Sequence, residues 1–255
     1  MSGPAERRRL SILPLLGIRP SAGEVVGTLL DRALDEAATR TAGAGRPVAV
    51  LDAACGRVSA LRPFRARIGD LAGADVRRPP AGAIGHLDRF VLADLCTDTE
   101  AFAPATFDVI LLSFAVEHLV DPPAAFANLA RWSRPGATLV VMTVNRRHPF
   151  VGAYLGLPAP LRDRLQATVK AGPADVHILV GVDTCTTRRG LADALRAAGW
   201  ADVRIGTVGH LARAWARTWP TFAIGLAGDV ATAGMPARRS TLIAVARRPD
   251  GPAAP

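Results

Sequence analysis

The stretch VLDAACGRV, residues 50–58, decides the predicted fold. Its first residues continue the apolar run that starts at Val48, which is typical of a strand buried on both faces of a parallel sheet. Asp52 stands at the end of this run, and the small residues up to Gly56 permit a tight turn. The turn has a single glycine and no phosphate-loop lysine, so it is not typical of a loop that cradles phosphates. We therefore expect a ligand loop at the end of a central strand.

Apolar runs and helical patterns alternate over most of the chain. Runs typical of strands lie at residues 48–51, 68–76, 90–93, 107–113, 137–144, 203–208 and 241–246. Apolar residues at helical spacing cover residues 24–40, 122–132 and 187–198, and a turn is expected at 134–136. The alternation predicts a Rossmann-like, doubly wound α/β sheet with helices on both faces.

One domain is expected, because the chain shows no internal repeat and no second core pattern. The first twenty residues contain three prolines and an arginine cluster, so we expect a flexible N-terminal arm over residues 1–20. The domain then covers residues 21–250.

The composition excludes several classes of function. The net charge is +9, but nearly all positive charge is arginine scattered along the chain, so we expect no nucleic-acid partner. No run of about 18 or more apolar residues occurs, and we expect no membrane partner. Cys55, Cys96 and Cys185 lie far apart without metal-ligand spacing, which predicts no metal site and a reducing, cytoplasmic setting. For Cys55, inside the ligand loop, packing is the preferred role over that of a nucleophile.

An acidic residue follows each of the first three predicted strands. Asp52, Asp75 and Asp94 stand at these ends, and ligands of open α/β sheets bind outside the carboxyl ends of the strands. Each acid alone has an ordinary explanation as a helix cap or a solvated loop residue. Together they supply acceptors for the ribose hydroxyls and the exocyclic amine of an adenosine. The set predicts an adenosine ligand without phosphate.

Five motifs in order resemble the class I methyltransferases that use S-adenosylmethionine, and most of all their small-molecule branch, often called type 11. The motifs are VLDAACGR (50–57), AGAD (72–75), LADL (92–95), FDVILLSFAVEHLVDP (107–122) and RPGATLVVMT (134–143), and TTRRGLADALRAAGW (186–200) fits the family's tail. The resemblance implies a seven-stranded sheet whose last strand is antiparallel. It also implies S-adenosylmethionine as cofactor and S-adenosylhomocysteine as product.

The resemblance assigns the cofactor contacts residue by residue. The loop from Asp52 through Ala54 to Gly56 would lie under the amino-acid end of the cofactor. Asp75 would bind the ribose, and Asp94 would bind the adenine edge beside the backbone N–H of Leu95. Ser113 and Phe114 would face the sulfonium and the incoming substrate.

The loop departs from the family pattern at two positions. The family would place glycines where this chain has Ala54 and Val58. Alanine tolerates a positive φ less well than glycine, and we expect the β-branched valine to narrow the approach. Because Asp52 and Gly56 remain, we expect the loop still to bind the cofactor.

Methyl transfer to a hydroxyl is helped by a base, and histidine titrates near neutral pH. His118, in the EH pair that matches the family, and His148 follow the fourth and fifth strands, so we predict them as catalytic candidates. The alternative is that His118 only caps or packs beneath the next helix. His177 lies in an expected lid segment, whereas His86 and His210 receive no role.

Residues 148–183 and 210–237 fall where the family keeps variable substrate cover, and Arg146 and Arg147 are candidates for holding an acidic substrate group. The aromatic residues of these segments, Tyr154, Trp215, Trp219 and Phe222, suggest an apolar, even polycyclic, small-molecule acceptor, although core packing explains them equally well. We predict methyl transfer to an oxygen or carbon nucleophile in secondary metabolism. Two alternatives stay open: a non-methylating cyclisation or elimination on the same fold, and a non-catalytic binding subunit. The oligomeric state is also open.

Overall fold

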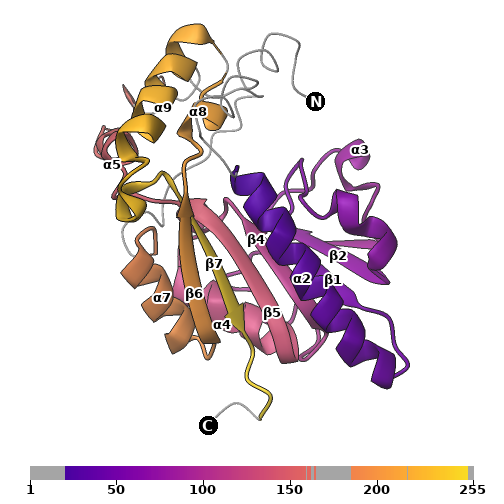
Figure 1. The fold of residues 1–255 in the computed structure, drawn as a ribbon. Helices are drawn as coiled ribbons and strands as arrows, with labels where there is room; N and C mark the ends of the chain where they lie inside the picture. Colours follow the sequence, from indigo (N-terminus) through magenta and orange to yellow (C-terminus); the bar gives the residue numbers. More distant parts are fainter. Residues whose placement is uncertain (1–20, 159, 162–163, 165–184, 217, 252–255) are drawn as a thin grey trace.

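The computed structural model describes residues 21–158, 160–161, 164, 185–216 and 218–251 (Figure 1). The expected arm, His177 and much of the first cover segment lie outside these residues. One seven-stranded sheet has the order β3-β2-β1-β4-β5-β7-β6. Its strands are β1 (Ala49–Ala53), β2 (Asp70–Asp75), β3 (Arg89–Leu92), β4 (Phe107–Ser113), β5 (Ser133–Val144), β6 (Ala201–Val208) and β7 (Thr241–Arg247).

The direction of the strands confirms the predicted topology. β1 to β5 pair in parallel, whereas β7 lies antiparallel between β5 and β6. The carboxyl ends of β1 to β6 therefore meet at one edge of the sheet. This edge is where the sequence places its candidate ligand residues.

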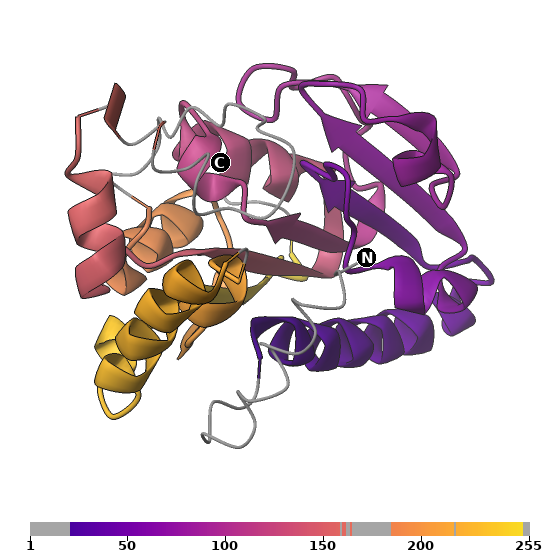
Figure 2. The same cartoon turned by 90° about the horizontal axis from the view of Figure 1, so that it is seen from above.

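Helices cover both faces of the sheet, as expected. The long helix α2 (Ala22–Gly43) lies on one face, and α4 (Pro122–Trp132) and α7 (Arg188–Ala197) lie on the other (Figures 1 and 2). Shorter helices connect these elements: η2 (Arg62–Arg67), α3 (Ala81–Ile84), η3 (Val116–His118), α5 (Pro149–Leu155), α8 (Leu211–Ala214), α9 (Trp219–Thr232) and η4 (Pro236–Arg238). The connections from β1 to β2 and from β2 to β3 thus carry only η2 and α3, in place of the full helices typical of a doubly wound sheet.

The sequence explains where α2 begins and which face it buries. Ser21 and Glu24 form a capping box, in which each side chain accepts a hydrogen bond from the other residue's backbone N–H. Val26, Leu30 and Leu34 recur at helical spacing and are buried against the sheet. The helix therefore starts at Ala22, two residues before the start expected from the apolar spacing alone.

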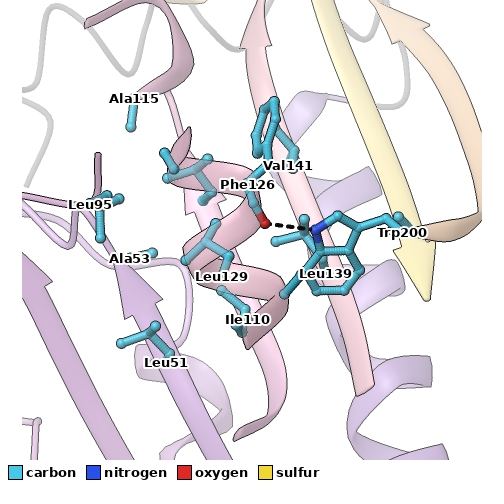
Figure 3. Packing of buried hydrophobic residues seen from close by; sticks show 14 of the residues in the cluster. Leu51, Ala53, Leu95, Ile110, Ala115, Phe126, Leu129, Leu139, Val141 and Trp200 are labelled. Carbon is cyan, nitrogen blue, oxygen red and sulfur yellow. Dashed lines mark hydrogen bonds between the residues drawn. The ribbon is translucent and has the colours of Figure 1, made fainter. Parts of the chain in front are cut away.

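Alternate residues of each strand enter opposite layers of the core. Leu51 and Ile110 pack towards α4 and α7, whereas Val50 and Leu111 pack towards α2. Figure 3 shows the layer between the sheet and the helices α4 and α7. There the indole Nε1 of Trp200 donates a 3.1 Å hydrogen bond to the carbonyl oxygen of Phe126. This bond satisfies the polar atom of a buried aromatic residue.

One expected element boundary is wrong, and one segment forms helices for which the sequence analysis predicted no element. β5 starts at Ser133 directly after α4, so the predicted turn at 134–136 is part of the strand. The strand is irregular at this point: Gly136 has φ +73°, and the register with β4 shifts between Phe107 and Val109. The segment between β6 and β7 has no clear pattern in the sequence, yet it forms α8 and α9. Alanine and glycine dilute the helical spacing of the larger apolar residues in α9.

Candidate functional site

The three predicted acids stand in a row along the carboxyl edge of the sheet. Asp52 lies near the end of β1, Asp75 ends β2, and Asp94 follows β3. These strands are direct neighbours in the order β3-β2-β1. The topology therefore brings together carboxylates that are far apart in the sequence.

The loop after β1 turns sharply and is fastened to β2. Ala54 and Gly56 both have positive φ, at 55° and 49°. The N–H of Cys55 donates to the carbonyl oxygen of Ala74, and the N–H of Gly56 donates to Oδ2 of Asp75, each at 3.0 Å. Ala54 thus adopts the conformation for which the family uses glycine.

Val58, which we expected to narrow the approach to this loop, is 88% exposed. Its side chain therefore crowds no other residue of the described fold. The departure from the family pattern that matters for the loop is the alanine.

Asp52 is a buried acceptor with an unused atom. Its side chain is 2% exposed, and Oδ2 has no hydrogen-bond partner among the described residues. Burial raises the pKa of Asp52 to about 7; a hydrogen bond with Ser59 lowers it, and the charge of Asp75 raises it. A cationic ligand group beside Oδ2 would favour the ionised carboxylate.

Asp75 and Asp94 each hold the local backbone while remaining partly accessible. Asp75 accepts hydrogen bonds from the N–H groups of Gly56 and Arg77, one on each oxygen. Asp94 accepts a 2.8 Å bond from the N–H of Cys96 through Oδ1. A carboxylate has about four acceptor positions, so both groups keep acceptor capacity for a ligand.

The loop after β3 fixes the backbone of Leu95. Its side chain is buried, and its carbonyl oxygen accepts a 2.9 Å bond from the amide of Asn128 on α4. Its N–H makes no hydrogen bond within the described residues. The arrangement leaves a backbone donor beside Asp94, as the cofactor assignment requires.

The end of β4 carries an unusual backbone. Ser113 is the last residue of the strand, and Phe114 follows with φ 49°. The N–H of Phe114 still donates a 2.7 Å bond to the carbonyl oxygen of Met142 on β5. This conformation redirects the chain at the strand end and leaves both side chains partly accessible.

His118 lies in η3, at the same end of the sheet, and its side chain is partly accessible. The neighbouring Glu117 is 3% exposed and accepts a 2.7 Å bond from the hydroxyl of Thr143 on β5. Glu117 therefore fastens η3 to the sheet, while His118 lies nearer to the surface. The catalytic role of His118 stays a prediction.

His148 lies beneath α9. Its side chain is fully buried, Nδ1 accepts from the N–H of Val151 as the cap of α5, and the ring contacts Phe150 edge to face. Burial lowers the pKa of His148, while the nearby backbone of Gly228 and the charge of Asp229 act in the opposite direction. These contacts are those of a structural cap, and the catalytic role of His148 stays a prediction.

His210 is a residue that the sequence reasoning missed. It follows β6, and its ring stacks on that of Phe114 with centroids 5.5 Å apart. Burial, followed by the charge of Arg213, lowers the pKa of His210 to about 4, and Nδ1 has no hydrogen-bond partner among the described residues. We predicted His118 because it is a polar residue just after a strand. His210 meets the same criterion.

Cys55 has the character of a packing residue. It is buried against Gly73, and burial together with the charges of Asp52 and Asp75 raises the pKa of its thiol to about 12. A thiol with this pKa is not a nucleophile at neutral pH. Within the described residues, no group of three or more histidine, cysteine, aspartate or glutamate side chains is arranged to hold a metal ion.

A groove lies away from the three acids, between α2, the strands β6 and β7, and the end of α9, where Val230 lines it. Its lining includes Leu29, Arg204 and Ile243, together with the ion pair of Arg247 and Glu36. Because Asp52, Asp75 and Asp94 take no part in it, we assign this groove no role in cofactor binding.

Sequence comparison relates the chain to a known family. A family profile described as "Methyltransferase domain" matches residues 24–205. The demethylmenaquinone methyltransferase of Mycobacterium sp. (strain KMS) is 31% identical over 106 residues, which cover 40% of this chain and 46% of that protein. The chain thus spans about half the length of this relative. None of the helices in the described ranges is both long and apolar enough to cross a membrane.

Solved structures share the fold at low sequence identity. Geranyl diphosphate C-methyltransferase from Streptomyces coelicolor A3(2) has a TM-score of 0.58 and 15% identity, and the match covers 97% of this chain and 84% of that one. The [4+2]-cyclase SpnF has a TM-score of 0.50 and 18% identity, with 87% and 81% covered. The same sheet therefore occurs in proteins that carry out different reactions.

Proposed function

Because this chain belongs to the class I S-adenosylmethionine-dependent methyltransferase family, we propose that it transfers a methyl group to an oxygen or carbon nucleophile of an apolar small molecule. One observation carries the proposal. The carboxylates of Asp52, Asp75 and Asp94 stand at the ends of three adjacent strands, beside a tight loop in which Ala54 and Gly56 have positive φ.

The described residues fit S-adenosylmethionine. Asp52 offers a buried oxygen without a partner to the ammonium group at the amino-acid end of the cofactor. Asp75 and Asp94 keep acceptor capacity for ribose hydroxyls and the adenine amine, while the N–H of Leu95 is a donor for a ring nitrogen. The turn at Ala54 and Gly56 supplies a close backbone surface without phosphate-binding character.

When bound, the cofactor supplies a methyl group activated by a positively charged sulfur. The protein then has to align the acceptor and exclude water. In this proposal Ser113 and Phe114 face the reacting end from β4, and His118 accepts the proton of an acceptor hydroxyl. The ring of His210 stacks on the ring of Phe114. Because His210 is neutral at pH 7, it adds no positive charge near the sulfonium.

The acceptor class rests on the cover segments and on relatives. The described parts of the two expected cover segments, α5 with α8 and α9, lie at the carboxyl end of the sheet (Figure 1). The relative with 31% identity is named for demethylmenaquinone. We propose an apolar ring system as acceptor, in secondary metabolism and in the cytoplasm.

A non-methylating reaction is the second candidate. It is favoured by the fold shared with a cyclase and by the replacement of a loop glycine by Ala54. A binding subunit without catalysis is disfavoured by the retention of all three carboxylates.

Titration calorimetry with S-adenosylmethionine tests the cofactor site. Asp75→Ala and Asp94→Ala are each expected to weaken binding by about 1.5 to 3 kcal/mol, because each removes a charged acceptor. Asp193→Ala is the matched control, since Asp193 lies exposed on α7 with only long ion pairs to Arg189 and Arg196. Parental affinity in both site variants would show that the cofactor is held elsewhere.

A radiolabelled methyl-transfer assay with phenolic, quinol and enolic ring acceptors then separates methyl transfer from the second candidate. Labelled product supports methyl transfer. Cofactor binding together with acceptor turnover that leaves the label on the cofactor would favour the non-methylating reaction.

A further inference from the structure

The outward face of α9 carries no polar side chain. We call this surface the α9 face; its exposed residues are Trp219, Pro220, Ala223, Ile224, Ala227, Val230 and Ala231. Trp219, Ile224 and Val230 are 54%, 51% and 53% exposed. A helix at a protein surface normally turns charged or polar residues to solvent. The α9 face does the opposite over the whole length of the helix.

The inward side of α9 explains why no charge reaches this face. Asp229 is the helix's one ionisable residue, and it is 3% exposed. Its carboxylate accepts from the N–H groups of Leu211 and Ala212 and interacts with the hydroxyl of Ser240. Asp229 thus fastens α9 to α8 and to Ser240, the residue before β7, and the exposed side is left to apolar residues.

The apolar surface continues onto α5 and past the end of α9. Phe150 is 36% exposed and lies against α9, where a Cβ on Gly228 would come within 2.8 Å of its ring. Met235, just after the helix, is 43% exposed. Figures 1 and 2 show α5 and α9 together at one end of the molecule.

The exposed charges on α5, α8, α9 and the described segments that flank them are of one sign. The described residues 145–158, 209–216 and 218–240 include the arginines Arg146, Arg147, Arg213, Arg238 and Arg239, and their one acidic residue is the buried Asp229. Arg238 is exposed at the end of η4, six residues after the last residue of α9. Within these described segments, the surface combines an apolar helix face with positive charge and without exposed carboxylates. Glu36 on α2, which is paired with Arg247, lines the groove that Val230 also lines.

We propose that the α9 face docks on the surface of an anionic lipid bilayer, with its apolar side chains in the headgroup region and the arginines near the lipid phosphates. Apolar helices in the interface plane bind through buried apolar area and through attraction to anionic lipids. This proposal goes beyond the proposed function, because it concerns where the protein sits and not what it methylates. The expectation of no membrane partner rested on the lack of a spanning segment, which surface docking does not need.

A second copy of the chain fits the same surface less well. A helix of 14 residues is about 21 Å long and about 10 Å across. One face of it is smaller than the ~800 Å² that each partner contributes to a standard protein interface. The area is sufficient for a reversible contact with lipid.

Vesicle co-sedimentation of the full chain, without cofactor, tests the proposal. The probes are vesicles of equal parts phosphatidylcholine and phosphatidylglycerol, and vesicles of phosphatidylcholine alone. The parent is expected to bind the mixed vesicles more strongly. Ile224→Gln combined with Val230→Gln is expected to lower the partition constant by about tenfold or more, because two half-buried apolar contacts with lipid are lost. Arg238→Glu is expected to weaken binding to the anionic vesicles and to leave binding to neutral vesicles unchanged.

Leu92→Gln combined with Val120→Gln is the matched control. Both residues are exposed, at 59% and 73%, and neither belongs to α5, α8 or α9. If the Ile224 and Val230 variant unfolds, Ala227→Gln with Ala231→Gln tests the same face. Failure of the parent to bind, or equal binding by site and control variants, overturns the proposal. So does a parental dimer in light scattering that only the α9 variants dissociate, since this would assign the face to a second copy.

Discussion

The ring of Phe114 stacks on the imidazole of His210, with centroids 5.5 Å apart and planes inclined by 30°. This contact joins the end of β4 to the residue that follows β6, across the ends of β5 and β7. His210 is deep in the structure, although part of its surface remains accessible. The pair therefore forms a neutral aromatic wall at the edge of the sheet where ligands of this fold bind.

The depth of His210 predicts a pH-dependent contribution to stability. Its pKa is about 4 in the folded protein, against 6.5 for an unperturbed histidine, so the unfolded chain binds more protons between these values. The contribution of the buried, neutral imidazole to the free energy of unfolding is complete above pH 6.5 and is lost as the pH falls towards 4. His210→Phe removes this proton uptake, so the parent is expected to lose stability relative to the variant over that range. Urea unfolding across the range measures the difference; a constant difference would contradict the assignment.

The backbone of the ligand loop predicts opposite effects of two small substitutions. An L-residue in the left-handed region costs about 1 to 2 kcal/mol, and glycine costs about 0.5 to 1 kcal/mol of extra chain entropy. Ala54→Gly is therefore expected to raise the free energy of unfolding by about 0.5 to 1 kcal/mol. Gly56→Ala is expected to lower it by a similar amount, because an added Cβ meets only the oxygen of Ala54 at 4.0 Å. Thermal unfolding of both variants checks this; two changes of the same sign would argue against backbone strain.

The sequence predicts the sheet well because its signals are local. The apolar run before Asp52 and the acids after the next strands follow from the alternation of strand and connection. The antiparallel β7 was expected only from the resemblance to the methyltransferase family. α9 was missed because its pattern depends on small residues. Gly225 and Gly228 allow close packing on α8 and Phe150, where a Cβ would come within 2.8 Å of other atoms. In a sequence, such glycines suggest that a helix ends. In α9 they instead allow other elements to pack closely against the helix.

The roles of the histidines could not be predicted, because burial depends on elements distant in sequence. His148 and His210 both follow strands, yet α9 covers the first completely while the second stacks on Phe114. The positions of the three acids were easier to predict, because the carboxyl ends of neighbouring strands converge in any parallel sheet. Position at a strand end therefore identifies site candidates but does not distinguish a cap from a ligand-facing group.

The buried state of Asp52 predicts that cofactor affinity depends on pH. With a pKa of about 7, much of the free protein has this carboxyl protonated at neutral pH. A cationic ligand group favours the carboxylate, so the affinity for S-adenosylmethionine is expected to rise with pH up to about 7 and to level off above it. Below this value the loss approaches about tenfold per pH unit. Calorimetry in buffers of different ionisation enthalpy should detect proton release on binding.

Two variants separate this effect from general acid sensitivity. Asp52→Asn is expected to abolish the pH dependence and the proton release, at a lower affinity above pH 7. Asp193→Asn, on the surface of α7, is expected to retain both. Proton release that persists in Asp52→Asn would assign it to another group.

The opposite end of the sheet holds a buried charge cluster that predicts a large loss of stability. Asp108 is 1% exposed and accepts two 2.7 Å bonds from Arg46, one 3.0 Å bond from the N–H of Ala49 and one 3.2 Å bond from Arg134. Burial by itself would raise the pKa of Asp108, but the hydrogen bonds of Arg46 and Ala49 and the arginine charges outweigh it and lower the pKa. Its contribution is therefore present above pH 3.8 and is lost as the pH falls below that value.

Asp108→Ala is expected to lower the free energy of unfolding by about 2 to 4 kcal/mol, since it leaves a backbone donor and two cations without their partner. The value stays below that of a fully buried pair, because the side chains of Arg46 and Arg134 are 31% and 27% exposed. Asp70→Ala is the control: its pair with Arg89 joins side chains that are 35% and 46% exposed, and its loss should cost at most about 1 kcal/mol. Denaturant unfolding at neutral pH compares the two; equal losses would mean that the cluster at Asp108 contributes no more than a surface ion pair.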